Sequence, residues 1–199
     1  IDALGADLLS LSAHKFHGPK GVGALYVRRR QRVARLSPRV FGGGQERGLR
    51  SGTLDVPGIV GLGAAAELAA ASLEAEAVSL GQLRDRLWQG LASHISDVHL
   101  NGPPLGNPGQ RLPGNLNVRI GGVDGQTLLA TLGEGELAVS SGSACSSATP
   151  RPSHVLRAIG LDDDQARASL RFGLSRFTTA DEIDQAVGLI AAAVGRLRA

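Results

Sequence analysis

The sequence predicts an α/β protein whose 199 residues divide into two domains. Two short apolar runs, residues 8–12 and 22–27, flank a Gly-Pro-Lys-Gly turn, a pattern typical of neighbouring β-strands. An Ala/Leu/Glu-rich stretch from about residue 57 to 93 indicates one long or kinked helix. Beyond this helix the pattern changes to short alternating strands and helices, which indicates that a second domain begins there.

The second half of the chain carries the strongest local signal. Thr179 and Glu182 form a capping-box pattern, and apolar residues then recur at helical spacing. The acidic triplet 162–164 is typical of a turn and a helix start, where the helix dipole favours negative charge. The core stripe of the last helix should consist of Ile183, Val187, Ile190, Val194 and Leu197. The remaining expected elements are strands near 98–100, 116–120 and 137–140, and helices near 125–132 and 153–159.

The composition predicts a soluble globular protein of the reducing cytoplasm. Hydrophobic residues make up 42% of the chain and charged residues 20%, which allows a sizeable core. A single cysteine excludes an internal disulfide and a four-thiolate metal site, and we expect no signal segment and no apolar span of about 20 residues. His14 and His17 lie three residues apart, but we expect no metal site, because the acidic triplet fits a helix start better.

A net charge of +3 raises the question of nucleic-acid binding. Aromatic residues make up only 3% of the chain and none interleaves with the local arginine cluster, so a stacking surface for bases is missing. A solvated loop after a strand explains the cluster better, and we expect neither nucleic acid nor a membrane as a partner. The cluster consists of Arg28, Arg29, Arg30, Arg32 and Arg35.

Lysine is rare in this chain. Of the 21 basic side chains only Lys15 and Lys20 are lysines, and both lie within residues 12–21. A desolvated lysine amine can lose its proton and form an imine with a carbonyl group, whereas a guanidinium group stays protonated. Since arginine fills almost every other basic position, a lysine that is kept indicates a chemical role such as imine formation. His14 shares this functional interpretation because it precedes Lys15; the alternative is a hydrogen-bonded core histidine.

The only cysteine, Cys145, stands in the segment Ser-Ser-Gly-Ser-Ala-Cys-Ser-Ser, residues 140–147. Its small polar neighbours predict an exposed, mobile loop rather than a buried structural position. A hydrolytic nucleophile would need a histidine base and an orienting third group, which the sequence cannot place. A sulfur carrier needs only an exposed, reactive thiol that can move. The sulfur-carrier interpretation therefore requires fewer other residues than the hydrolytic one.

Two other motif interpretations are weaker. Ser12 and Lys15 fit the S-x-x-K signature of penicillin-interacting enzymes, but the accompanying K-T-G and S-D-N motifs are missing. The glycine-rich segments 18–23 and 42–52 match neither a Walker loop nor a dinucleotide fingerprint. Their backbone N–H groups, with the Thr53 hydroxyl, could bind one phosphate, and plain turn structure remains the alternative.

Four separated segments together resemble the cysteine desulfurases, and they occur in the order typical of that family. They are residues 12–27, 42–53, 140–147 and 170–179. The resemblance is to the group with a long active-site loop, which supplies sulfur for iron-sulfur cluster and nitrogenase assembly. It implies fold type I of the enzymes that use pyridoxal 5′-phosphate (PLP) and a homodimer. Residues 1–71 would end the large cofactor domain, and residues 72–199 would form the small domain that carries the cysteine loop.

The resemblance also implies roles for the cofactor-binding residues. Lys15 would hold PLP as a covalent imine, while Ser12 and His14 would contact the cofactor phosphate. Thr53 would reach the phosphate of the cofactor in the partner subunit.

For the substrate, the same resemblance implies that Arg171 binds the carboxylate of L-cysteine. Cys145 would accept the sulfur as a persulfide, alanine would leave, and an iron-sulfur scaffold or another acceptor protein would take the sulfur.

The resemblance further predicts that the chain is the C-terminal half of a longer enzyme and is inactive alone. In this family the histidine that stacks on the cofactor ring and the aspartate that pairs with the ring nitrogen lie upstream of the lysine. Two alternatives remain open. One is another type I PLP lyase or aminotransferase, such as a selenocysteine lyase, against which the Cys145 segment argues. The other is a non-catalytic remnant that serves in dimerisation or scaffold binding.

Overall fold

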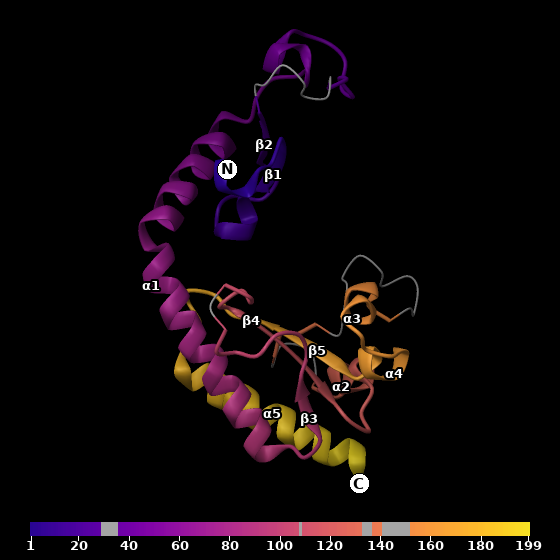
Figure 1. Cartoon of the computed structure of the whole chain (residues 1–199). Helices are drawn as coiled ribbons and strands as arrows, with labels where there is room; N and C mark the ends of the chain where they lie inside the picture. Colours follow the sequence, from indigo (N-terminus) through magenta and orange to yellow (C-terminus); the bar gives the residue numbers. More distant parts are fainter. Residues whose placement is uncertain (29–35, 108, 133–136, 141–151) are drawn as a thin grey trace. The chain divides into compact units, whose positions relative to one another are not determined.

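The computed structural model describes residues 1–28, 36–107, 109–132, 137–140 and 152–199 (Figure 1). The chain divides into two compact units, Ile1–Leu73 and Glu74–Ala199. Helix α1 (Val56–His94) contributes residues to both units. Each unit is described by itself below.

The first unit is built on a β-hairpin. Strand β1 (Leu8–Ser12) pairs antiparallel with β2 (Gly23–Val27), from Leu8 opposite Val27 to Ser12 opposite Gly23, which confirms the prediction of neighbouring strands. Three 3₁₀ turns accompany the hairpin and the start of α1: η1 (Asp2–Leu4), η2 (Ala13–Phe16) and η3 (Gln45–Gly48).

The two strands approach each other closely at Gly23. A Cβ atom at this position would overlap the carbonyl oxygen of Leu11 in β1. We therefore expect Gly23→Ala to lower the free energy of unfolding by about 1–3 kcal/mol, the usual cost of overpacking. Gly44→Ala is the control, because nothing lies within 4 Å of the added methyl group and its φ is −80°. Chemical denaturation of both variants measures the difference, and equal stability would contradict the close approach.

Arg28, directly after β2, is buried rather than solvated, so the expected solvated position is wrong for this residue. Only 8% of it is exposed, and its guanidinium donates to the Ala6 carbonyl oxygen at 3.0 Å and to the Asp2 carboxylate at 2.5 Å. The hydrogen bond from Arg28 lowers the pKa of the Asp2 carboxyl. Arg28 therefore fastens the N-terminal segment to the hairpin. The other four arginines of the cluster lie outside the described residues.

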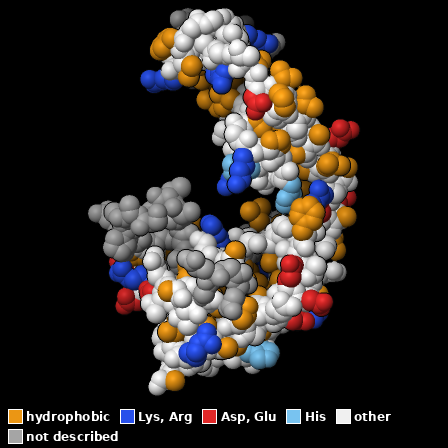
Figure 2. Space-filling model, turned by 180° about the vertical axis from the view of Figure 1, so that it is seen from behind, with side chains coloured by type: hydrophobic (Ala, Val, Ile, Leu, Met, Phe, Trp, Pro, Cys, Tyr) orange, Lys and Arg blue, Asp and Glu red, His pale blue; other side chains and the backbone are white. Residues whose placement is uncertain are grey.

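Helix α1 confirms the predicted long helix. Asp55 caps its start, since the Asp55 carboxylate accepts a hydrogen bond from the Gly58 backbone N–H at 3.1 Å. Along its first half, large apolar side chains are exposed, as the hydrophobic colouring in Figure 2 shows. They are Val56, Ile59, Val60, Leu68 and Leu73.

The expectation that no apolar span of about 20 residues exists is wrong for α1. An 18-residue window of this helix has a mean hydropathy of 1.6, and only 11% of that window is buried. By length and composition the helix could cross a membrane. Its hydropathy comes mainly from valine, isoleucine and leucine, and a core helix of a soluble protein can have the same composition. Composition alone therefore does not assign α1 to a membrane.

The second unit contains a three-stranded antiparallel sheet in the order β3 (Val98–Leu100), β4 (Asn115–Ile120) and β5 (Ser169–Gly173). The second half of α1 and helix α5 (Ala180–Arg198) lie side by side along the sheet (Figure 1). Arg86 and Asp184 join these two helices at 2.5 and 2.7 Å, and this hydrogen bonding lowers the pKa of the Asp184 carboxyl. The pair is about half exposed, so it adds little to stability.

Alternating residues of β4 divide the sheet into two faces. Leu116, Val118 and Ile120 are fully buried in the hydrophobic core, together with Leu170 and Phe172 of β5. The opposite face carries polar residues of the same two strands. They are Asn115, Asn117, Arg119, Ser169 and Arg171.

The predicted elements of this unit are mostly confirmed. Helix α5 begins with the expected capping box at Thr179 and Glu182, and four of the five predicted stripe residues are buried, with Leu197 partly buried. The acidic triplet opens a helix, as predicted. The three short helices are α2 (Gly125–Thr131), α3 (His154–Ala158) and α4 (Asp163–Arg167).

Two strand assignments differ from expectation. Residues 137–140 do not form a strand, because only Ser140 pairs, in a single bridge with Arg171. Strand β5 was not predicted, although it completes the sheet. Both differences reflect long-range pairing, which the local apolar pattern does not specify.

Candidate active site

Lys15 lies in the 3₁₀ turn η2, directly after β1, and its side chain is exposed. Ser12, at the end of β1, and His14, in the same turn, are also exposed. No hydrogen bond or ion pair is found for the amine of Lys15 within the described part of the chain. An amine, an imidazole and a hydroxyl group thus stand within four consecutive residues and are accessible to a ligand.

The turn that carries Lys15 is fixed by its buried backbone. Ala13 is fully buried, its N–H donates to the Val22 carbonyl oxygen at 3.1 Å, and its own carbonyl oxygen accepts from Gly18 N–H at 2.9 Å. His17 closes the turn with a φ of +66°, in the left-handed region. A Cβ atom at Gly18 would lie 2.9 Å from the Ala13 Cβ, so glycine is needed there. The sequence therefore builds a tight, braced turn and leaves Lys15 outside it.

Hydrogen bonds within the glycine-rich segment 42–52 stabilise its conformation. Ser51 Oγ donates to the Gly43 carbonyl oxygen at 2.6 Å, and Gly52 N–H donates to the Gln45 side chain at 3.1 Å. Thr53 follows this segment and is exposed, without a hydrogen bond of its side chain to any other described residue. No contact joins Thr53 to Ser12, His14 or Lys15 in the described residues, so the phosphate role of Thr53 stays a prediction.

Arg171 lies on β5, on the polar face of the sheet, and is exposed. Within the described residues its guanidinium group makes no hydrogen bond or ion pair. A planar donor group of this kind can bind a carboxylate through two parallel hydrogen bonds. The geometry is therefore compatible with a carboxylate-binding role.

The backbone of Arg171 connects this residue to the start of the cysteine segment. Arg171 N–H donates to the Ser140 carbonyl oxygen at 2.7 Å, and Ser140 N–H donates back to the Arg171 carbonyl oxygen at 3.2 Å. Cys145 itself lies outside the described residues. Ser140, five residues before the thiol, is thus held directly beside the arginine expected to bind substrate.

A polar network on the same face of the sheet was missed by sequence reasoning. Asn101 is 2% exposed; its Nδ2 donates to Asn117 Oδ1 at 2.7 Å and to Ser169 Oγ at 2.9 Å. Its Oδ1 accepts from Arg119 Nη1 at 3.0 Å. Alternation along β4 predicts which side chains share a face, but the neighbours across the strands depend on register, which the sequence does not reveal.

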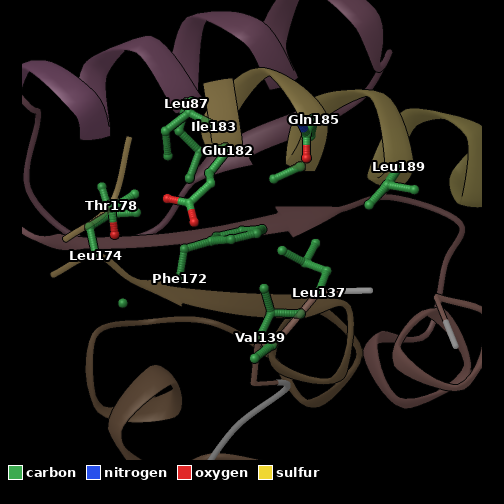
Figure 3. A pocket seen from close by; sticks show the side chains of 13 residues that line it. Leu87, Leu137, Val139, Phe172, Leu174, Thr178, Glu182, Ile183, Gln185 and Leu189 are labelled. Atoms are coloured by element: carbon green, nitrogen blue, oxygen red, sulfur yellow. The ribbon is translucent and has the colours of Figure 1, made fainter. Parts of the chain in front are cut away.

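The second unit also contains a cavity of about 410 Å³, shown in Figure 3. It is lined mainly by apolar side chains from β5, α5 and residues 137–139, with Glu182 and Thr178 among the polar ones. Phe172 lines it, whereas the neighbouring Arg171 belongs to the opposite face of the sheet. None of the predicted site residues that the structure describes lines this cavity.

Comparisons with known proteins give the family. The cysteine desulfurase IscS of Tolumonas auensis is 53% identical over 198 residues, which cover 100% of this chain and 47% of that protein. A solved structure titled NifS-like protein has a TM-score of 0.81 and 36% identity, over 98% of this chain and 48% of that chain. Another, titled SspA in complex with cysteine, has a TM-score of 0.61 and 35% identity, over 89% of this chain and 46% of that chain.

The chain thus spans about half the length of the curated relatives it matches. The structural likeness confirms the predicted α/β fold of the type I PLP-dependent enzymes. The model of the family described as aminotransferase class-V matches residues 1–186. The chain belongs to the aminotransferase class-V family.

Proposed function

We propose that this chain is part of a PLP-dependent cysteine desulfurase, which converts L-cysteine to L-alanine and transfers the sulfur to Cys145. The observation that carries the proposal is the paired backbone of Ser140 and Arg171. It joins the start of the segment that carries Cys145 to the strand residue Arg171, whose guanidinium has no partner among the described residues. A thiol expected close to a carboxylate-binding arginine supports a desulfurase over a PLP enzyme that needs no thiol. The similarity to IscS over the whole chain and to a protein titled as a complex with cysteine supports the same substrate.

The described residues fit one side of the PLP cofactor. Lys15 offers an exposed amine for covalent attachment, and Ser12 and His14 offer phosphate donors in the same braced turn. The carboxylates of Asp2 and Asp55 are already engaged, by Arg28 and by the N-terminus of α1. In our proposal, residues 1–71 therefore supply the attachment and phosphate side of a large cofactor domain, and residues 72–199 form the small domain.

In the proposed reaction Lys15 acts twice. Its amine would hold the cofactor, and with L-cysteine bound the same amine would take the proton from the substrate Cα atom. The bound cofactor supplies an electron sink for the resulting negative charge. Arg171 would bind the substrate carboxylate through its planar pair of donors and so restrict the orientation of the bound substrate.

Cys145 then performs the sulfur transfer. Its thiolate attacks the sulfur atom of the substrate, an S–S bond forms and the C–S bond breaks. The electron pair of that bond stays with the three-carbon fragment, which takes one proton at Cβ, regains one at Cα and leaves as alanine. The products are therefore alanine and a Cys145 persulfide, and the terminal sulfur passes to an acceptor.

We propose that the protein forms a dimer with a second copy of itself and passes sulfur to an iron-sulfur scaffold or another acceptor protein. We further propose that it acts in the cytoplasm. In the dimer Thr53 would contribute to the cofactor phosphate site of the partner subunit. The exposed position of Thr53, without an internal partner among the described residues, is compatible with this role.

Product analysis of the native protein that contains this chain tests the proposed function. With L-cysteine, PLP and a thiol reductant it should form alanine and sulfide in equal amounts. A protein that accepts selenocysteine but not cysteine would be a selenocysteine lyase instead. A protein that binds no PLP and forms neither product would refute the enzyme and favour a non-catalytic role.

We expect Arg171→Lys to weaken the use of L-cysteine, because lysine keeps the charge but loses the two-pronged donor geometry. The loss should be on the order of 1–3 kcal/mol in kcat/KM, the range for a hydrogen bond to a charged group. Steady-state kinetics measure it. Arg167→Lys is the control, since Arg167 lies on α4 and is paired with Asp163. Unchanged kinetics of Arg171→Lys would move the carboxylate site elsewhere.

A further inference from the structure

Asn117 lies directly opposite Arg171 in the antiparallel pair of β4 and β5. Leu174 N–H donates to the Gly114 carbonyl oxygen, and Ile120 N–H donates to the Ala168 carbonyl oxygen. Since hydrogen-bonded and non-hydrogen-bonded pairs alternate along an antiparallel ladder, the pair of Asn117 and Arg171 is non-hydrogen-bonded. In such a pair the Cα atoms are about 4.5 Å apart and the side chains are close neighbours on one face.

The remaining backbone bonds agree with this assignment. Arg171 exchanges both of its backbone hydrogen bonds with Ser140, on the side away from β4. Asn117 turns its carbonyl oxygen the other way and accepts from Asn101 N–H at 2.9 Å. Asn101, Asn117, Arg171 and Ser140 thus form one row across the sheet, with Asn117 next to the carboxylate-binding arginine.

The chemistry of the network fixes which way the Asn117 amide points. Arg119 can only donate, so the atom of Asn101 that it contacts must be the Oδ1 acceptor. Ser169 Oγ gives its proton to the Gln165 carbonyl oxygen at 2.7 Å, so it accepts from Asn101 Nδ2. Asn101 Nδ2 is therefore the donor to Asn117, and the atom of Asn117 that faces it must be Oδ1.

This orientation leaves the Nδ2 group of Asn117 available. Within the described residues this group has no hydrogen-bond partner. It is not among buried polar atoms that lack a partner, so it is accessible to a ligand. The residue directly opposite Arg171 therefore offers a neutral N–H donor on the same face of the sheet, and its direction is set by Asn101, which is 2% exposed. Two adjacent donors of this kind suit the two oxygens of one carboxylate.

We propose that Asn117 is a second carboxylate-binding residue, whose Nδ2 donates to the substrate carboxylate beside Arg171, and that Asn101 is the positioning residue that orients its amide. This inference rests on the proposed function, because it assigns a partner to the carboxylate of that substrate. It makes the site selective for a free amino acid over an amine that lacks the carboxylate.

Binding of L-cysteine and of cysteamine, its analogue without a carboxylate, to the PLP-loaded native protein tests this inference. Dissociation constants come from titrations of the cofactor absorbance. Asn117→Ala should weaken L-cysteine binding about ten-fold, as expected for one hydrogen bond to a charged group, and leave cysteamine binding unchanged. Asn115→Ala is the matched control, since Asn115 lies on the same face of β4 but opposite Gly173, and it should change neither constant.

A second variant guards against a structural effect. Asn117→Asp keeps the oxygen that accepts from Asn101 but replaces the Nδ2 donor with a negative oxygen, so it should weaken L-cysteine more than Asn117→Ala does. Equal loss of both ligands in Asn117→Ala, or wild-type L-cysteine binding in Asn117→Asp, would overturn the role of Asn117. If Arg171→Lys selectively weakens L-cysteine while both Asn117 variants do not, the proposed function stands and only this inference fails. A native protein that binds no L-cysteine would refute both.

Discussion

Cys145→Ser should abolish sulfur transfer from L-cysteine while leaving PLP binding and cysteine binding intact. A serine hydroxyl is much less nucleophilic toward sulfur than a thiolate, and it cannot hold sulfur as a persulfide. Since Lys15 and Arg171 are unchanged, the substrate should still bind and change the cofactor absorbance. Sulfide release and persulfide formation, measured with the native protein, should fall to background.

Ser146→Ala is the control for this prediction, because it changes the adjacent residue without removing the thiol. It should keep sulfide release near the parent rate. If Cys145→Ser still forms sulfide at the parent rate, Cys145 is not the sulfur acceptor, and a direct release of sulfide would replace the transfer step.

Lys15→Ala should remove both covalent attachment of PLP and proton removal from the substrate. Loss of a general base alone costs about 10²–10⁴-fold in rate, so alanine formation should fall by at least about 100-fold. Borohydride reduction of the parent protein, followed by peptide mapping, should find the pyridoxyl group on Lys15.

Lys20→Ala provides the matched control, five residues along the same exposed segment. It should keep the imine absorbance and the activity. A pyridoxyl group on Lys20, or an active Lys15→Ala variant, would contradict the assignment.

Much of the fold follows from local sequence signals. The capping box at Thr179, the stripe of α5 and the two strands of the hairpin all appear where the pattern predicts them. These elements are set by neighbours in the sequence, through helix capping and apolar periodicity.

The elements that sequence reasoning missed depend on distant partners. Residues 137–140 have a strand-like composition, but a strand requires a continuous ladder of pairs. Only Ser140 pairs, in a single bridge with Arg171. The burial of Arg28 likewise depends on Asp2 and Ala6, more than 20 residues earlier in the chain. Periodicity carries no information about such pairings.

In the candidate site, too, local sequence signals predict some residues, whereas others depend on distant partners. The rarity of lysine and cysteine directs attention to Lys15 and Cys145, because chemistry constrains the residue type. Asn117 gives no such signal, since the role proposed for it depends on its position opposite Arg171 in the neighbouring strand and on an amide direction set by Asn101. Register and hydrogen-bond direction emerge only from the folded sheet.

The most direct test of sulfur transfer is to locate the sulfur after a single turnover. The native protein, loaded with PLP and freed of reductant, is mixed with L-cysteine; alanine is quantified, and the protein is digested for mass spectrometry. We predict one alanine for each added sulfur atom, with that sulfur on the peptide containing Cys145. Alanine formation with no sulfur on Cys145 would contradict the proposed transfer.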